Sequence, residues 1–245
     1  MIAKDKVNVI ILAGGQGTRI KALYPDVPKP MIPVAGRPFI EWVIEYFFQQ
    51  GLRRFIISLG YQAHIAEDYF QKRVANDTVI TTVRESAGLG TGGALLFAHR
   101  SDPSGEICVV ANGDSLVLTE LSSVWKLLED PAVDAVIVGV EAEDAGRYGS
   151  LKIGPDGRLL GFQEKQPGQG LINAGVYFFK RHIFSHFPQK TPLSLEVDGF
   201  PELLKAGVRI RVYACKDPFI DIGTPEGLEK ADSFLKRHFP SGGDL

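Results

Sequence analysis

Apolar residues in the first half of the chain follow two alternating kinds of spacing. Four short segments read as strands, namely VNVIILA (7–13), RRFIISLG (53–60), DTVITTVRE (77–85) and EICVVANGD (106–114). Three segments between them have helical apolar spacing, namely PFIEWVIEYFFQQG (38–51), AHIAEDYFQKR (63–73) and TGGALLFAHR (91–100). The first strand is a continuous apolar run, which is typical of a strand covered on both faces. The alternation predicts a parallel sheet with ligands at the carboxyl ends of its strands.

The second half begins with the same alternation of helix and strand patterns and then continues with consecutive strands. A helix is expected in LTELSSVWKLLED (118–130) and a strand in DAVIVGV (134–140). Three strands follow, two of them joined by a Pro-Asp-Gly turn in YGSLKIGPDGRLLGFQEK (148–165) and the third in GLINAGVYFFK (170–180). The last segments return to helix, strand and helix in SLEVDGFPELLKAG (194–207), VRIRVYAC (208–215) and TPEGLEKADSFLKRHF (224–239). Thr224 is the expected N-cap of the final helix, with Pro225 at its first position.

These patterns predict the fold class. We expect an α/β protein with a Rossmann-like, doubly wound, mostly parallel sheet, to which a small antiparallel or mixed sheet is added in the second half. The length of 245 residues suits one large α/β domain, so we predict a single domain over residues 1–245.

The composition narrows the classes of partner. The formal net charge is −2, so no global charge recruits nucleic acid or an anionic membrane, and an anion site must be built locally. The first residues do not fit a secretory signal, and no segment is long enough to span a bilayer. Cys108 and Cys215 lie in strand-like apolar runs, which favours buried, inert thiols and a cytoplasmic location.

The segment GGQGTR (14–19) has the properties of an anion-binding loop. Its glycines allow successive backbone N–H groups to converge on phosphate oxygens, and Arg19 adds a planar, permanently charged group. It lacks the G-K-[ST] ending of a P-loop and the spacing of a dinucleotide fingerprint. Taken alone, such a segment is more often a tight turn.

A second cation follows within the sequence VPKP. Pro28 and Pro30 stiffen the chain and bias it away from helix, so we expect Lys29 to be held rigidly on an extended segment. An isolated Pro-Lys-Pro is usually a surface loop, but the two motifs together after a buried strand are more specific.

With these motifs the chain resembles the sugar-phosphate nucleotidyltransferases, whose pattern is roughly G-G-x-G-[ST]-R followed by P-K-P. The matching residues are Gly14, Gly15, Gly17, Thr18, Arg19, Pro28, Lys29 and Pro30. The resemblance continues in family order through GLGTGGA (88–94), NGD (112–114), RYG (147–149), EK (164–165), NAG (173–175) and DIGTPE (221–226). It implies a GT-A-like nucleotidyltransferase fold, and a reaction that joins a nucleoside triphosphate to a sugar 1-phosphate and releases pyrophosphate.

The resemblance also assigns roles to individual residues. It implies that residues 1–118 mainly bind the nucleotide and residues 119–245 mainly bind the sugar phosphate. The implied nucleotide-binding residues are Leu12, Ala13, Gly14, Gly15, Gly17, Thr18, Arg19, Lys29, Glu85, Gly90, Thr91, Asn112 and Asp114. The implied sugar-phosphate-binding residues are Gly149, Glu164, Lys165 and Asn173, and the implied catalytic residues are Arg19, Lys29, Asp114, Lys165 and Asp221.

The same resemblance assigns Asp114 and Asp221 to a Mg²⁺ ion. Each aspartate ends a predicted strand, and Mg²⁺ typically takes one or two carboxylates together with phosphate oxygens and water. Without the resemblance, turn or cap aspartates would be the more frequent interpretation.

Glu85 is the residue from which we predict the base of the nucleotide. Related thymidylyl and uridylyl enzymes commonly place a glutamine near this position, and its amide matches the alternating donor and acceptor edge of a pyrimidine. A carboxylate instead accepts from two donors in a row, which guanine offers as N1–H and N2–H₂, so the sequence favours GTP. The alternative is a carboxylate at a strand end that faces water.

Four segments carry a finer resemblance, namely RYGSLKIGPDGRLLGFQEK (147–165), GLINAGVYFF (170–179), SLEVDGFPELL (194–204) and FIDIGTPE (219–226). Together they resemble bacterial D-glycero-α-D-manno-heptose 1-phosphate guanylyltransferases, which supply GDP-heptose for capsule and other surface polysaccharides. Mannose 1-phosphate guanylyltransferases and uridylyltransferases acting on an N-acetylhexosamine or N-acetylmuramate 1-phosphate are the alternatives. The implied partners are GTP and a sugar 1-phosphate, and a homo-oligomer is compatible with the sequence. A noncatalytic homologue would lack the charged catalytic residues, which this sequence retains. A dinucleotide-dependent oxidoreductase needs a glycine fingerprint that the sequence lacks.

Overall fold

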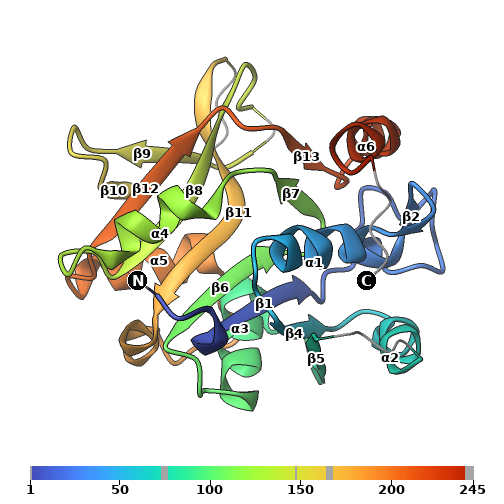
Figure 1. Cartoon of the computed structure of the whole chain (residues 1–245), viewed down its shortest axis with the longest axis horizontal. Coiled ribbons are helices and arrows are strands. Elements are labelled where there is room, and N and C mark those ends of the chain that lie inside the picture. The colour runs from blue at the N-terminus through green and yellow to red at the C-terminus, as the bar shows by residue number, and fades with distance from the viewer. Residues whose placement is uncertain (1, 73–76, 147, 164–167, 241–245) are drawn as a thin grey trace.

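The chain folds around one central sheet with helices on both faces (Figure 1). The structure is a computed structural model that describes residues 2–72, 77–146, 148–163 and 168–240. The predicted fold class is confirmed, because a large, mostly parallel sheet is combined with small antiparallel parts. The division of the chain into a nucleotide half and a sugar half stays a prediction.

The sheet has nine strands among the described residues, in the order β10-β9-β11-β6-β1-β4-β5, with β8 between β11 and β12. These strands are β1 (Val7–Ala13), β4 (Arg54–Leu59), β5 (Val79–Arg84), β6 (Ile107–Asn112), β8 (Ala135–Ala142), β9 (Ser150–Ile153), β10 (Leu159–Gln163), β11 (Gly170–Lys180) and β12 (Ile210–Cys215). Neighbours in the run β6-β1-β4-β5 are parallel, as predicted, whereas β11 is antiparallel to β6, β8 and β9.

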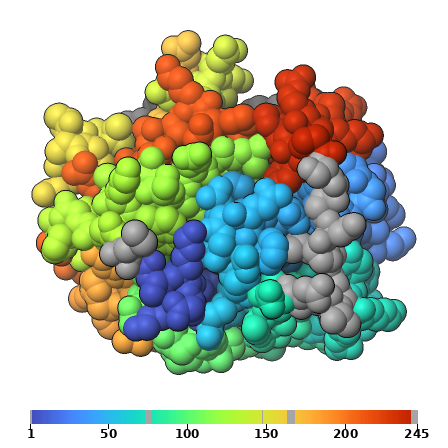
Figure 2. Space-filling view, viewed as in Figure 1, coloured from blue at the N-terminus to red at the C-terminus, as the bar shows by residue number. Residues whose placement is uncertain are grey.

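The helices cover the two faces of the sheet. They are α1 (Phe39–Gln49), α2 (Ala63–Gln71), α3 (Gly90–Ser101), α4 (Leu121–Glu129), α5 (Phe200–Lys205) and α6 (Pro225–His238). Figure 1 shows α1 and α4 in front of the sheet and α3 and α5 behind it, and each face carries its own apolar core. In the space-filling view, α4 in green adjoins α1 in light blue, with α6 in red above (Figure 2). The observed elements agree with the predicted ones, and Thr224 caps α6 by accepting from the Gly227 N–H.

The antiparallel strands of the second half extend the main sheet instead of forming a layer of their own. The connection is β11, whose 11 residues reach β6, β8 and β9. Its register against β8 shifts between Asn173 and Tyr177, and Gly175 in this bulge has a φ of +73°. One continuous sheet therefore joins strands from both halves of the chain.

Two pairs of very short strands lie outside the sheet, β2 (Pro33–Val34) with β3 (Arg37–Pro38) and β7 (Ser115–Val117) with β13 (Phe219–Asp221).

Both cysteines are free and buried, and burial raises the pKa of the Cys215 thiol to about 11, as expected for inert side chains. Among the described residues, no helix combines the length and the apolar character that crossing a membrane requires.

Candidate active site

The candidate site lies where the parallel strands end. Residues in register on β1, β4 and β6 point to the same face of the sheet, so Ile10, Ile56 and Val110 form a row that packs in the core under α3. Two residues further along the strands, the same face presents Leu12, Ser58 and Asn112. The apolar surface thus gives way to polar groups at the carboxyl ends of the strands, which is where open α/β sheets bind ligands.

A first cavity of about 580 Å³ opens at these strand ends. Its lining includes the loop after β1, Glu85 at the end of β5, the start of α3, and the turn after β6. The lining residues are Leu12, Gly14, Gly15, Gln16, Gly60, Tyr61, Glu85, Ser86, Ala87, Gly88, Leu89, Gly90, Thr91, Ala94, Asn112 and Asp114. The cavity volume is within the range of small-molecule and cofactor sites.

A second cavity, of about 360 Å³, adjoins the first and is lined by most of the charged residues of the site. It is lined by Leu12, Ala13, Gly15, Gly17, Thr18, Arg19, Lys29, Pro30, Asn112, Asp114, Ser115, Tyr148, Asn173, Phe219, Asp221 and Gly223. Leu12, Gly15, Asn112 and Asp114 line both cavities. Asp114 is therefore at the boundary between the two spaces.

The pairing of β7 with β13 brings Asp114 and Asp221 together. In this pair Asp221 is in register with Ser115, and the Ile222 N–H donates to the Asp114 carbonyl over 3.0 Å. Each carboxylate is within 4 Å of one cation, since the Lys29 ammonium is 2.5 Å from Asp114 Oδ2 and 3.8 Å from Asp221 Oδ1. The two aspartates predicted to share a metal ion thus face the same point.

Burial and neighbouring charges both act on the pKa of Asp221. Burial raises this pKa above its usual value, and the negative charge of Asp114 raises it further, while Lys29 and Arg19 oppose the shift. Two carboxylates held together supply the hard oxygen donors that Mg²⁺ prefers, so the residues present fit the predicted ion.

Lys29 is held rigidly, although not on the extended segment that the prolines predict. Residues Lys29–Met31 form a short 3₁₀ turn after Pro28, whose own backbone is extended. Pro30 fits the first positions of such a turn because no N–H is needed there. Gly17, with a φ of +59°, packs so closely that a Cβ on it would lie 3.0 Å from the Lys29 Cβ. The expectation of an extended mount was wrong, but the lysine is nevertheless confined.

Asn173 lines the second cavity from the opposite side. Its Oδ1 accepts from the Gly175 N–H over 3.0 Å, and its Nδ2 donates to the Tyr177 hydroxyl over 2.8 Å. A Cβ on Gly175 would lie 2.4 Å from Asn112 Nδ2, so the glycine allows the bulge of β11 to approach the end of β6. Gly149, predicted to bind the sugar phosphate, lines neither cavity, but its carbonyl accepts from the Asn173 N–H over 2.9 Å.

The Glu85 carboxylate is in the first cavity, half-buried. Its Oε1 accepts a hydrogen bond of 3.0 Å from the hydroxyl of Ser58. Burial raises the pKa of Glu85, while hydrogen bonds from Ser58 and from the backbone of Leu89 oppose this rise. The structure places this carboxylate at the wall of the first cavity, and its role in base selection stays a prediction.

The structure brings most of the predicted site residues to the two cavities. Gly90, Thr91 and Glu85 line the first cavity only, and Arg19, Lys29, Asn173 and Asp221 line the second only. Glu164 and Lys165 lie outside the described residues. The chemical roles of all these residues stay predictions.

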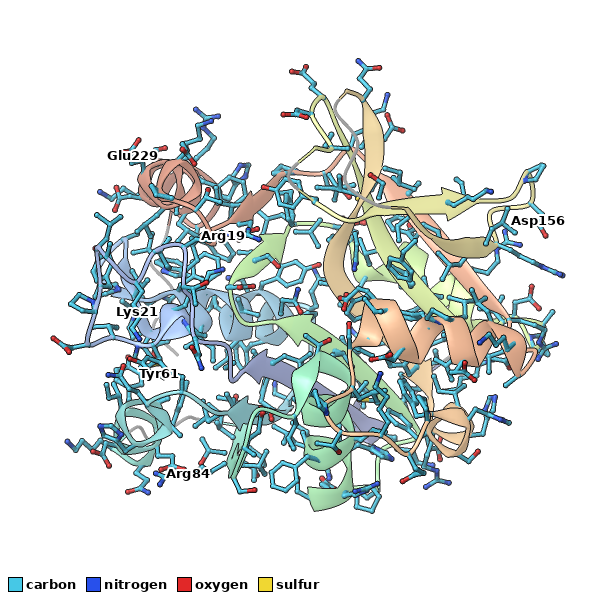
Figure 3. The ribbon with its side chains drawn as sticks, turned by 180° about the vertical axis from the view of Figure 1, so that it is seen from behind. Arg19, Lys21, Tyr61, Arg84, Asp156 and Glu229 are labelled. Carbon is cyan, nitrogen blue, oxygen red and sulfur yellow. The ribbon has the colours of Figure 1, made fainter. Side chains whose placement is uncertain are left out.

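Several residues at the cavities were missed in the sequence. Tyr61 lines the first cavity, and the Lys21 ammonium is 4.8 Å from the centre of its ring. Figure 3 shows both on the same side of the molecule as Arg19, whereas Asp156 is at the far end of the molecule. Ser58 lines neither cavity but donates to Glu85, and its sequence position gave a signal that could have been used, because it is a hydroxyl inside the apolar run FIISL.

Comparisons with known proteins show the family of the chain. A sequence model described as "Nucleotidyl transferase" matches residues 8–238. The chain belongs to the nucleotidyl transferase family. The predicted family and the predicted enzyme class, a nucleotidyltransferase, are thereby confirmed.

Members of the family with known names resemble the chain over nearly its full length. A D-glycero-alpha-D-manno-heptose 1-phosphate guanylyltransferase of Campylobacter jejuni is 33% identical over 90% of this chain and 96% of that protein. The enzyme of the same name from Aneurinibacillus thermoaerophilus is 32% identical over 95% of this chain and 100% of that protein. The crystal structure of HddC from Yersinia pseudotuberculosis complexed with GMP-PN has 35% identity and a TM-score of 0.82, covering 94% of this chain and 99% of that one.

Proposed function

We propose that this nucleotidyltransferase transfers a guanylyl group from GTP to D-glycero-α-D-manno-heptose 1-phosphate, giving GDP-heptose and pyrophosphate. The observation that supports guanine as the base is the position of the Glu85 carboxylate in the first cavity. A carboxylate can accept hydrogen bonds from the two adjacent donors on the edge of guanine. The names of the relatives from Campylobacter jejuni and Aneurinibacillus thermoaerophilus support the sugar.

The proposed chemistry is one displacement at the α-phosphorus. An oxygen of the sugar 1-phosphate attacks this phosphorus, the bond to the bridging oxygen breaks, and pyrophosphate leaves with the bonding electrons. Arg19 in the second cavity binds the departing phosphates, and Lys29 stabilises charge at the α-phosphate and the leaving oxygen. The site needs no covalent nucleophile for this reaction, only cations at fixed positions.

Asp114 and Asp221 would hold Mg²⁺ in this proposal. When bound there, the ion would neutralise phosphate charge and polarise the phosphoryl group. The support is the convergence of two carboxylates on one point beside Lys29.

The sugar is assigned to the side of the site formed by β11 and the turn that contains Gly149. Asn173 both donates and accepts, which suits a pair of vicinal hydroxyl groups, and Gly149 leaves room for a close approach to a ring. Lys165 and Glu164 are proposed to bind the sugar phosphate and a sugar hydroxyl, respectively. Mannose has the same ring stereochemistry as this heptose and differs at the exocyclic arm, so mannose 1-phosphate is the second candidate.

The experiment that tests the function is a substrate panel. Four nucleoside triphosphates are combined with heptose, mannose, glucose and N-acetylhexosamine 1-phosphates, with and without Mg²⁺, and released pyrophosphate is measured. We expect Mg²⁺-dependent release that is fastest with GTP and the heptose 1-phosphate. A panel without turnover would contradict the enzyme activity, and a preference for UTP with an N-acetylhexosamine 1-phosphate would favour the uridylyltransferase alternative.

A single substitution tests the base assignment. Glu85→Gln replaces two adjacent acceptors with one acceptor and one donor, which suits a pyrimidine edge better than guanine. Because hydrogen bonds to charged groups contribute about 1.5–3 kcal/mol, we expect the ratio of kcat/KM for GTP over UTP to fall roughly 10- to 100-fold. Steady-state kinetics with both nucleotides measures this ratio, and an unchanged value would remove Glu85 from base selection.

The cellular setting forms part of the proposal. We infer a cytoplasmic enzyme, supported by two free and buried cysteines, whose product enters a surface polysaccharide such as a capsule. Light scattering on the purified protein would establish whether the chain is a homo-oligomer.

A further inference from the structure

Ser58 occupies an unusual position for a hydroxyl group. It lies near the end of β4, between Leu12 on β1 and Val83 on β5, and its side chain is completely buried, with 0% exposed. A buried hydroxyl without a partner is costly, and the Ser58 hydroxyl donates to Glu85 Oε1 over 3.0 Å. The chain therefore keeps a polar side chain in an apolar strand at the one place where it meets the carboxylate.

The carboxylate is fixed from a second side by the loop after β1. A Cβ on Gly14 would lie 2.4 Å from Glu85 Oε1, so the backbone of this loop lies directly against the carboxylate oxygen. The Gly14 carbonyl in turn accepts from the Tyr61 N–H over 3.2 Å, and the Glu85 N–H donates to the Leu59 carbonyl over 2.7 Å. The backbone of Glu85 is thus held by β4, and its carboxylate is confined by the loop after β1.

These contacts leave the rotation of the Glu85 carboxylate plane about its terminal torsion undefined. The terminal torsion of a glutamate is broad and roughly two-fold, so packing alone defines it poorly. A hydrogen bond to one particular oxygen selects one orientation, because the donor must lie near a lone pair of that oxygen. Ser58 is the side chain that makes this selection at Oε1, and the backbone of Leu89 also donates a hydrogen bond to the carboxylate.

We propose that Ser58 is a positioning residue for base selection, which orients the Glu85 carboxylate so that it accepts from both N1–H and N2–H₂ of guanine. This inference rests on the proposed function. It predicts that Ser58 affects the discrimination between guanine and hypoxanthine, because these two bases differ only by the N2 amino group. A merely structural serine would affect both bases equally.

The test measures equilibrium binding of GDP and IDP by calorimetry in the wild-type protein and in Ser58→Ala and Ser58→Cys. Cysteine has nearly the size of serine but is a weak donor, so agreement between the two variants separates hydrogen bonding from packing. We expect the preference for GDP over IDP to fall by about 3- to 10-fold in both variants. This is less than the roughly 10- to 100-fold that follows from losing a hydrogen bond to a charged group, because the carboxylate remains and only its orientation is no longer fixed. Ser101→Ala, at the far end of α3, where the hydroxyl donates to the Ala98 carbonyl, is the matched control and should leave the preference unchanged.

A double-mutant cycle completes the test. In a Glu85→Ala background, Ser58→Ala should have no further effect on the ratio of GDP to IDP affinities, because the carboxylate that Ser58 orients is absent. An unchanged ratio in Ser58→Ala, or an equal loss in the Glu85→Ala background, would overturn the inference. Failure of the proposed function is distinguishable, because it would appear as absent turnover of GTP and heptose 1-phosphate, whereas the binding ratio is measured without turnover.

Discussion

Asp114→Asn is expected to lower kcat by about 10²- to 10³-fold while the fold is retained, in line with the loss of one charged group that acts on a phosphoryl transition state. Asp114 is at the boundary of the two cavities, 2.5 Å from the Lys29 ammonium, so it faces the point where the reacting phosphates would meet. Asparagine keeps the size of the side chain but removes its charge, so Mg²⁺ should be bound more weakly and packing should change little. The measurement is kcat as a function of Mg²⁺ concentration.

The control for this variant is Asp156→Asn. Asp156 is exposed in the turn between β9 and β10, pairs with Arg158 over 3.0 Å, and is remote from Arg19 (Figure 3). Its substitution should leave kcat and the Mg²⁺ dependence unchanged. Near-normal turnover of Asp114→Asn, with a thermal unfolding midpoint close to that of the wild type, would remove Asp114 from the proposed metal site.

The second large effect is expected at Lys29. Lys29→Met keeps the length of the side chain and removes the ammonium, so it should lower kcat by about 10²- to 10³-fold, with a smaller change in KM for the nucleotide. The reason is that charge builds on the leaving oxygen mainly in the transition state, where a fixed cation is most effective. The measurement is a full kinetic comparison with Lys152→Met, since Lys152 is exposed on β9.

Lys29→Arg separates the charge of this residue from its position. Gly17 packs against the Lys29 stem, and a Cβ on Gly223 would lie 2.5 Å from its Nζ, so little room exists for a wider guanidinium. We therefore expect Lys29→Arg to remain strongly impaired despite its retained charge. Full activity of this variant would show that the position of the cation matters less than its presence.

The sequence predicted the sheet and the helices well because each depends on local spacing. The continuous apolar run of β1 and the helical period of α1 and α6 are properties of short segments, and the structure reproduces them. The loop after β1 and the carboxylates at strand ends also follow from local order. The convergence of Asp114 and Asp221 was implied by the family resemblance and not by the strand order, because Asp221 ends β13, which lies outside the main sheet.

Other features depend on contacts between distant segments. The strands β7 and β13 have only three residues each, too few to show a period, and each forms because the other is present. The 3₁₀ turn at Lys29 replaces the expected extended segment because proline tolerates the first turn of a helix as well as an extended chain. The contact between Ser58 and Glu85 likewise requires the register of β4 against β5, which no single segment specifies.

The pairing of β7 with β13 makes the proposed metal site depend on two segments that are far apart in the sequence. Asp114 directly precedes β7, whereas Asp221 ends β13, and the two carboxylates meet only where these strands pair. In the proposed reaction, a change that separates β13 from β7 would therefore abolish metal binding without altering either aspartate.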